Sequence, residues 1–179
     1  MQTSLSETSV GHSLPDILGP GLSVIFCGIN PGLLAAASGH HFAGRNNRFW
    51  RVLYLSGFIP HPMGPEDGQT LLQYGYGLTT VVARPTRRAD QLARKEIEAV
   101  AAAFEQKIAQ ASPRYIAFLG KQAISVLVGR RDLCWGLHPD CIGGARTWIL
   151  PNPSGLNRSF SLNALTEAYR DLVNAARCS

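Results

Sequence analysis

A short apolar run followed by a turn rich in glycine and proline constrains this chain more than any other feature. Val24 to Cys27 combine apolar, β-branched and aromatic side chains, and Gly28 ends the run. A run without polar alternation is typical of a strand buried on both faces, as in parallel sheets. The turn Gly28-Ile29-Asn30-Pro31-Gly32 follows; its proline fixes φ, and its glycines allow close approach to the backbone. Loops after parallel strands bind ligands in open α/β sheets, so Asn30 is the first candidate functional residue.

Short apolar runs and segments of helical periodicity alternate along the rest of the chain. Four strands separated by helices favour a single-domain α/β protein, a three-layer α/β/α fold with a central, mostly parallel four-stranded sheet. Residues 1–14 lack periodicity and predict a flexible N-terminal tail before a domain over 15–179, in which 33–46 form a loop and 129–144 a polar connection. The expected strands are 22–28, 77–82, 115–119 and 147–150, and the expected helices are 47–54, 66–74, 93–110, 121–128 and 161–176.

Size, charge and cysteine content narrow the kind of protein without naming a substrate. The 179 residues suit one domain with a proper core, and 17 basic against 12 acidic side chains give a net charge of +5. A basic excess permits phosphate binding but does not require it. The four cysteines follow no metal-ligand spacing, so we expect free thiols. Because neither a secretory signal nor a run long enough to span a membrane is evident, we expect a cytoplasmic protein that binds no membrane.

Three polar loops are expected at one edge of the sheet, because the carboxyl ends of parallel strands lie together. Residues 28–32 follow the first strand, 84–90 the second and 151–158 the fourth. Lys121 joins them at the start of the helix after the third strand. These segments bring an amide, arginines, a carboxylate and a lysine to one place, which predicts a functional site at this edge.

The residues of these loops carry a family resemblance. GINPGL at 28–33 is followed by GHHFAG at 39–44 and NRFW at 47–50, while FLGKQA stands at 118–123 and NPSGLNR at 152–158. With these motifs in this order, the chain resembles the mismatch-specific uracil/thymine-DNA glycosylases of the uracil-DNA glycosylase superfamily. The resemblance covers nearly the whole chain after the expected tail.

The resemblance implies a monofunctional DNA glycosylase of base excision repair. Such an enzyme flips a nucleotide out of double-stranded DNA, because the N-glycosidic bond cannot be reached inside the duplex, and leaves an abasic site. The implied substrate is uracil mispaired with guanine, with mispaired thymine as a further candidate. No metal or cofactor is expected, and we expect a monomer, associated with the nucleoid if the source is bacterial.

Two other kinds of protein remain open on the sequence. A non-catalytic mismatch-binding module could use the same loops without breaking a bond. A nucleoside- or nucleotide-processing α/β enzyme could use the same sheet edge on a small substrate. Cleavage assays on duplex DNA and on free nucleoside, with an Asn30→Ala control, distinguish the three.

The resemblance implies roles for the residues after the first strand. Asn30 would orient the attacking water, although the residue type alone equally suits an ordinary turn. An amide oxygen can hold water but is a poor general base. Phe42 would stack on the flipped base, and a small Ala35 would admit the methyl group of thymine. Nearby backbone N–H groups are expected to stabilise the departing pyrimidine anion; the expected base-pocket residues are Gly28, Ile29, Gly32, Ala35 and Phe42.

The loop after the last strand is implied to engage the duplex. Leu156 is an apolar residue in a polar loop and would fill the space that the flipped nucleotide leaves. Arg158 would fill beside it or hold a phosphate, and backbone at Gly155 and Asn157 would meet the opposite guanine. Phosphate contacts position DNA without reading its sequence. The expected phosphate contacts are Lys121, Arg84 and Ser154.

Asp90 has competing roles. It is the one carboxylate expected at this edge and could be a second catalytic residue that acts as a general base. It could instead cap the helix expected over 93–110, or pair with Arg87 and Arg88. We favour the structural role, and the helix cap in particular.

Overall fold

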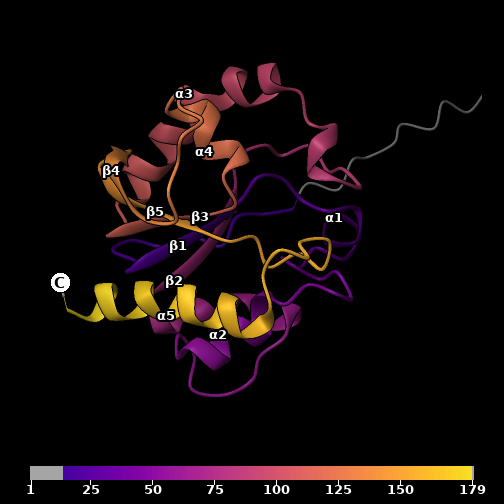
Figure 1. Ribbon diagram of the computed structural model, residues 1–179, viewed down its shortest axis with the longest axis vertical. Helices are drawn as coiled ribbons and strands as arrows, with labels where there is room; N and C mark the ends of the chain where they lie inside the picture. Colours follow the sequence, from indigo (N-terminus) through magenta and orange to yellow (C-terminus); the bar gives the residue numbers. More distant parts are fainter. Residues whose placement is uncertain (1–13, 179) are drawn as a thin grey trace, which may run out of the picture.

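The computed structural model describes residues 14–178 and contains one five-stranded sheet in the order β2-β1-β3-β5-β4 (Figure 1). The β1–β2, β1–β3 and β3–β5 pairs are parallel, and only the β4–β5 pair is antiparallel. The expected tail over 1–14 lies outside the described residues except for Leu14. The strands are β1 Val24–Gly28, β2 Tyr76–Thr80, β3 Tyr115–Leu119, β4 Gly136–Ile142 and β5 Ala145–Leu150.

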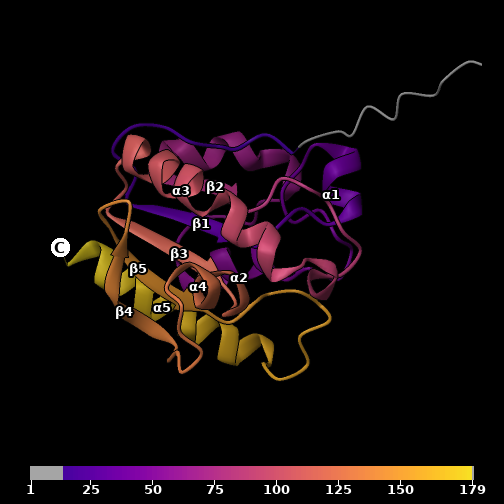
Figure 2. The same cartoon turned by 90° about the horizontal axis from the view of Figure 1, so that it is seen from above.

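Helices cover both faces of the sheet, which confirms the expected three-layer α/β/α fold (Figures 1 and 2). Helices α3 and α4 lie on one face, and α2 and α5 lie on the other. Within residues 14–178, no helix is both long and apolar enough to cross a membrane. The helices are α1 Leu33–Ser38, α2 Phe49–Ser56, α3 Arg94–Ala111, α4 Gln122–Leu127 and α5 Leu162–Arg177, with 3₁₀ segments η1 Pro65–Tyr74 and η2 Ala89–Gln91.

Strand β1 is buried along its whole length, as its apolar run predicts. Side chains alternate across a strand, so Val24 and Phe26 pack toward α2 and α5, while Ile25 and Cys27 pack toward α3 and α4. The ring of Phe26 meets the ring of Phe49 edge-on, with centroids 5.4 Å apart. The two hydrophobic layers hold β1 between β2 and β3 in the interior of the sheet.

Helix α5 closes the α2 side of the sheet because its apolar residues recur at helical spacing. The hydroxyl of Ser161 accepts a hydrogen bond from the N–H of Ala164 at 3.1 Å and caps the first turn. Tyr169 is fully buried, and its hydroxyl donates to the carbonyl of Pro151 at 3.3 Å. The helix therefore also fixes the point where the chain leaves β5; the fully or nearly fully buried positions of its stripe are Leu165, Tyr169, Leu172 and Val173.

The expectation of four strands was wrong by one. Residues 136–142, expected within a polar connection, form β4, which pairs with β5 at the edge of the sheet. An edge strand needs only one hydrogen-bonded side and tolerates proline, and Pro139 lies where the β4–β5 register shifts between Leu137 and Cys141. Its polar, half-exposed sequence hides the strand pattern.

The expected loop over 33–46 was also wrong in part. Residues Leu33–Ser38 form the short helix α1, which ends at Gly39 in a left-handed conformation with φ of 73°. Ala35 and Ala36 face inward, each 6% exposed. Most other element boundaries differ from the expected ones by one or two residues, because helix and strand ends are set by local hydrogen bonds.

The described chain begins with a strap, residues 14–17, that lies along the free edge of β2. The N–H groups and carbonyls of Ile17 and Leu78 exchange two hydrogen bonds of 2.8 Å. Asp16 accepts hydrogen bonds from Thr79 at 2.6 Å and from Lys107 at 2.9 Å. His41 Nε2 lies 2.8 Å from the carbonyl of Pro15, which fixes Nε2 as the protonated nitrogen. The strap therefore ties β2, α3 and the α1–α2 loop together.

Burial lowers the pKa of His41 from its ordinary value of 6.5, so the folded protein resists protonation of this ring. Below that value the unfolded chain binds a proton that the folded chain does not. We therefore expect the free energy of unfolding to fall as the pH decreases from about 7 to about 5. His41→Gln keeps an amide donor for Pro15 and removes the titration, so its stability should change less over this range.

Urea denaturation at a series of pH values measures both profiles. His40→Gln, on the exposed neighbouring histidine, is the matched control for the same substitution. Parallel profiles for the wild type and His41→Gln would show that His41 does not contribute to the pH dependence.

Candidate active site

A cleft of about 920 Å³ opens where β1, β2 and β5 end, at the edge that the sequence predicts. Its walls come from four places: the turn after β1, helix α1 with the α1–α2 loop (residues 39–48), the loop after β2, and the β5–α5 loop (residues 151–161). All of the expected base-pocket residues line it, as do Asn30 and the expected duplex-contact residues. These lining residues are Gly28, Ile29, Asn30, Gly32, Ala35, Phe42, Ser154, Gly155, Leu156, Asn157 and Arg158.

The side chain of Asn30 is held by the loop after β2. Its Nδ2 donates to the carbonyl of Arg84 and to the hydroxyl of Thr86, both at 2.8 Å. Thr86 Oγ1 in turn donates to the carbonyl of Arg88 at 2.8 Å, so the acceptor is itself oriented. Asn30 Oδ1 accepts no hydrogen bond from residues 14–178. The amide therefore presents a fixed, free acceptor in the cleft.

Phe42 forms a half-buried aromatic wall. Its ring centroid lies 4.0 Å from that of Phe49, so one face is backed by the core. Its φ of 58° is unusual for a residue with a side chain, and such strain is commonly found at functional sites. The backbone N–H groups of Asn30 and Phe42 donate no hydrogen bond within the described chain.

Small residues shape the inner end of the cleft. Ala35 is 6% exposed, and its side chain is the shortest that a chiral residue can place there. A Cβ on Gly28 would lie 3.7 Å from Thr80 and 3.8 Å from the Phe42 ring. A larger residue at either position would fill part of the cleft.

The β5–α5 loop presents one apolar side chain to solvent. Leu156 is 73% exposed, the largest value among the exposed large apolar residues of the described chain. The loop is braced internally: Asn157 Nδ2 donates to the carbonyl of Asn152 at 2.9 Å, and the N–H of Leu156 donates to Ser154 Oγ at 3.2 Å. Leu156 is therefore held outward by an ordered loop.

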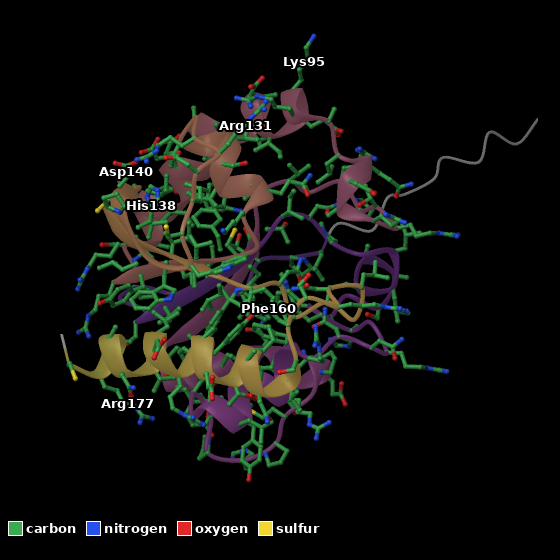
Figure 3. The ribbon with its side chains drawn as sticks, in the orientation of Figure 1. Lys95, Arg131, His138, Asp140, Phe160 and Arg177 are labelled. Atoms are coloured by element: carbon green, nitrogen blue, oxygen red, sulfur yellow. The ribbon has the colours of Figure 1, made fainter. Side chains whose placement is uncertain are left out.

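The side chain of Arg48 holds the β5–α5 loop in place, a role that was not predicted from the sequence. Its guanidinium donates hydrogen bonds of 2.7–3.3 Å to four backbone carbonyls of the loop. One acceptor is the carbonyl of Phe160, which Figure 3 shows beside the start of α5, while Arg177 marks the other end of that helix. Arg48 belongs to the NRFW motif, but nothing in the motif names the acceptors, which lie more than 100 residues away.

The lining of the cleft is cationic. Among the described residues that line it, four are arginines and none is Asp or Glu. Arg88 pairs with Asp90, whereas the other three make no hydrogen bond or ion pair within residues 14–178. Arg158 was an expected DNA contact. Arg45 and Arg87 were not expected as DNA contacts, although Arg87 lies in the basic loop over 84–90. The three available arginines are Arg45, Arg87 and Arg158.

Two expected phosphate contacts lie outside this cleft. Arg84 makes two hydrogen bonds to the carboxylate of Glu96, at 2.7 and 2.8 Å, which lower the pKa of Glu96 to about 2. Its guanidinium is therefore already committed to an anion. Lys121 lines a smaller neighbouring pocket of about 220 Å³, and its Nζ lies 4.2 Å from the ring centroid of Trp135.

The expected helix cap at Asp90 was wrong. Helix α3 begins at Arg94, and the carboxylate that caps it belongs to Glu96, which accepts the N–H of Ala93 at 2.9 Å. Asp90 lies in η2 with its side chain 62% exposed and pairs with Arg88 at 2.7 Å, as the alternative interpretation expected. It does not line the cleft.

Neither the Cys27 thiol nor a metal-binding cluster forms a second site among residues 14–178. Burial raises the pKa of the Cys27 thiol, which keeps it protonated and unreactive. Among residues 14–178, no group of three or more His, Cys, Asp or Glu side chains is placed to hold a metal ion. The chemistry of the described chain is therefore concentrated in the cleft around Asn30.

Comparison with known proteins identifies the fold and the family. The chain is similar over 91% of its length to the solution structure of a candidate uracil DNA glycosylase from Methanosarcina acetivorans, 98% of which is covered, with a TM-score of 0.62 and 22% sequence identity. That likeness shows the same fold. The family model of the uracil DNA glycosylase superfamily matches residues 15–173, a range that includes all residues that line the cleft except Leu14. The chain belongs to the uracil DNA glycosylase superfamily.

Proposed function

We propose that this protein is a monofunctional DNA glycosylase that hydrolyses the N-glycosidic bond of uracil, and of thymine, mispaired with guanine in duplex DNA. One observation carries the proposal: a cationic cleft that holds a free amide oxygen on Asn30, an aromatic wall at Phe42 and an exposed apolar side chain at Leu156. This combination suits a flipped nucleotide better than a free nucleoside, because a small substrate has no use for Leu156.

In the proposed reaction, the target nucleotide leaves the base stack and its base enters the cleft. Asn30 Oδ1 accepts a hydrogen bond from water and aims it at the anomeric carbon of the sugar. Positive charge develops on the sugar while the pyrimidine departs as an anion. The N–H groups of Asn30 and Phe42 can donate to that anion, and such fixed donors commonly supply much of the rate enhancement. Because no Asp or Glu lines the described cleft, the proton of the attacking water passes to solvent water, and the departing pyrimidine anion takes up a proton from solvent.

The pocket supports acceptance of both uracil and thymine. Phe42, backed by Phe49, offers a rigid face on which a pyrimidine can stack, an interaction worth roughly 1–3 kcal/mol. Ala35 leaves room for the 5-methyl group that distinguishes thymine. The backbone at Gly28, Ile29 and Gly32 forms the remaining wall of the proposed base pocket.

The outer part of the cleft is proposed to hold the duplex. Leu156 fills the gap in the base stack, and backbone at Gly155 and Asn157 meets the opposite guanine. Arg158, Arg87 and Arg45 bind phosphates, with Ser154 as a neutral partner. We leave Asp90 and Arg84 out of the site, because their charges are paired with Arg88 and Glu96. Lys121 remains a proposed phosphate contact only for DNA that extends beyond the cleft.

A panel of labelled duplexes tests the function directly. G:U, G:T, A:U and A:T duplexes are incubated with the protein, and abasic sites are cleaved with alkali and separated on a gel. We expect cleavage at G:U, weaker cleavage at G:T, and little at the paired controls. Binding to mismatches without any abasic product would identify a non-catalytic module, and cleavage of free deoxyuridine in preference to DNA would identify a nucleoside-processing enzyme.

Asn30→Ala should lower excision by about 10²–10³-fold, because the water loses its fixed acceptor. Binding of mismatched duplex should stay within about twofold, since Asn30 does not belong to the duplex-contact loop. Single-turnover kinetics and fluorescence anisotropy measure the two effects. Excision at the wild-type rate would reduce Asn30 to a turn residue.

Leu156→Ala should weaken engagement of the mismatched duplex, because the vacated stack is no longer filled. The side chain is 73% exposed, so its removal should leave the melting temperature unchanged. We expect a loss of about tenfold in excision from duplex, corresponding to ~1.4 kcal/mol. Leu137→Ala, on the exposed edge strand β4, is the matched control. The same loss in both variants would contradict a role for Leu156 in flipping.

Removal of a cleft arginine should change the salt dependence of DNA binding. For Arg87→Ala or Arg158→Ala, the slope of log K against log salt concentration should decrease by about one. Arg84→Ala removes the same charge from an arginine that is paired with Glu96, so it should leave the slope unchanged. Equal slopes for all three variants and the wild type would show that these arginines do not bind phosphate.

A further inference from the structure

We propose that Arg48 is a positioning residue, which sets Leu156 at the correct distance from the base pocket and so couples duplex opening to excision. The inference rests on the proposed function and adds a residue to it. Arg48 itself does not line the cleft; its guanidinium lies behind the β5–α5 loop.

The hydrogen bonds of Arg48 enclose Leu156 on both sides along the chain. On the N-terminal side, Nε donates to the carbonyl of Pro153 at 3.3 Å and Nη2 to that of Ser154 at 3.0 Å. On the C-terminal side, Nη2 donates to the carbonyl of Asn157 at 2.8 Å and Nη1 to that of Phe160 at 2.7 Å. One rigid, planar group therefore fixes both ends of the segment that carries Leu156.

The backbone of Arg48 adds a fifth link and joins the loop to the pocket wall. Its N–H donates to the carbonyl of Pro153 at 3.0 Å. On the cleft side, Gly155 packs so closely on Asn46 that an added Cβ would lie 2.6 Å from both the Cβ and the carbonyl oxygen of Asn46. Asn46 and Arg48 belong to the α1–α2 loop, which also carries Phe42. A shift of the β5–α5 loop therefore changes the distance between Leu156 and Phe42.

The charge of Arg48 has no carboxylate partner within residues 14–178. Its four guanidinium acceptors are neutral carbonyls, so the side chain acts through the direction of its donors more than through its charge. A guanidinium presents its donors in a fixed plane, whereas an ammonium is a flexible point charge with three donors. Lysine at this position keeps the charge but cannot reproduce four bonds to four separate carbonyls.

Arg48→Lys tests the proposal, with Arg51→Lys as the matched control. Arg51 lies exposed on α2, three residues along the chain, and its side chain makes no hydrogen bond within the described residues. We expect Arg48→Lys to lower excision from a G:U duplex by ~10-fold to 10²-fold, as for a misplaced contact, while Arg51→Lys stays at the wild-type rate. A 2-aminopurine beside the mismatch, whose emission rises when its neighbour leaves the stack, should show reduced flipping.

The double variant Arg48→Lys/Leu156→Ala distinguishes positioning from a general loss of stability. If Arg48 acts through Leu156, the double variant should be no slower than the slower single variant, because both changes remove the same interaction. Multiplied effects, or an Arg48→Lys variant that matches Arg51→Lys in excision and flipping, would overturn the proposal.

Two further measurements keep the outcome clear. Gly155→Ala forces the same loop away from Asn46 without altering Arg48, and it should show the same loss of flipping even if Arg48→Lys does not fold. Wild-type protein that neither flips nor excises uracil would refute the proposed function itself. If the wild-type protein excises uracil and both Arg48→Lys and Gly155→Ala flip the nucleotide fully, only the role of Arg48 is refuted.

Discussion

Strand β1 is paired on both edges with parallel strands, and the position of the cleft follows from that pairing. The ladder to β2 continues beyond the strand ends: Val82 donates to the carbonyl of Ile29 at 2.9 Å, and Thr86 donates to that of Pro31 at 3.0 Å. Asn30 lies between these two links. Its side chain is therefore directed by backbone hydrogen bonds of the sheet, and its amide needs only the loop after β2 to fix its rotation.

The sequence was sufficient to predict the layers and most of the cleft, for a physical reason. A strand buried on both faces has to be apolar throughout, so β1 and β3 are visible as apolar runs. Parallel pairing then brings the loops after the strands to one edge without further information. Parallel pairing accounts for Asn30 and Leu156, which follow β1 and β5, whereas Phe42 was expected at the site from the family resemblance; the structure has all three in one cleft.

What the sequence did not predict depends on partners chosen in three dimensions. Arg84 and Asp90 were expected near the site as charges, but whether a charge is available depends on its neighbour. Arg84 forms an ion pair with Glu96 in the first turn of α3, and Arg88 forms one with Asp90. The role of Arg48 was not predicted for a different reason. Its acceptors are backbone carbonyls, which every residue has, so no side-chain pattern in the sequence marks them. Strand β4 escaped because an edge strand needs no apolar alternation.

The distribution of acidic side chains explains why the lining of the cleft is cationic and why it holds no general base. Glu96 and Asp90, in and just after the loop that follows β2, are each bound to an arginine, and the β5–α5 loop uses carbonyls in place of carboxylates to hold Arg48. Three of the four arginines that line the cleft, Arg45, Arg87 and Arg158, therefore have no carboxylate partner among the described residues, and in the proposed function they bind phosphates. In the proposed reaction the same arrangement leaves water without a general base, which typically forgoes about 10²–10⁴-fold in rate. Recognition of the flipped nucleotide, through Phe42, Leu156 and fixed N–H donors, must then supply most of the catalysis, and a slow, selective enzyme is the expected result.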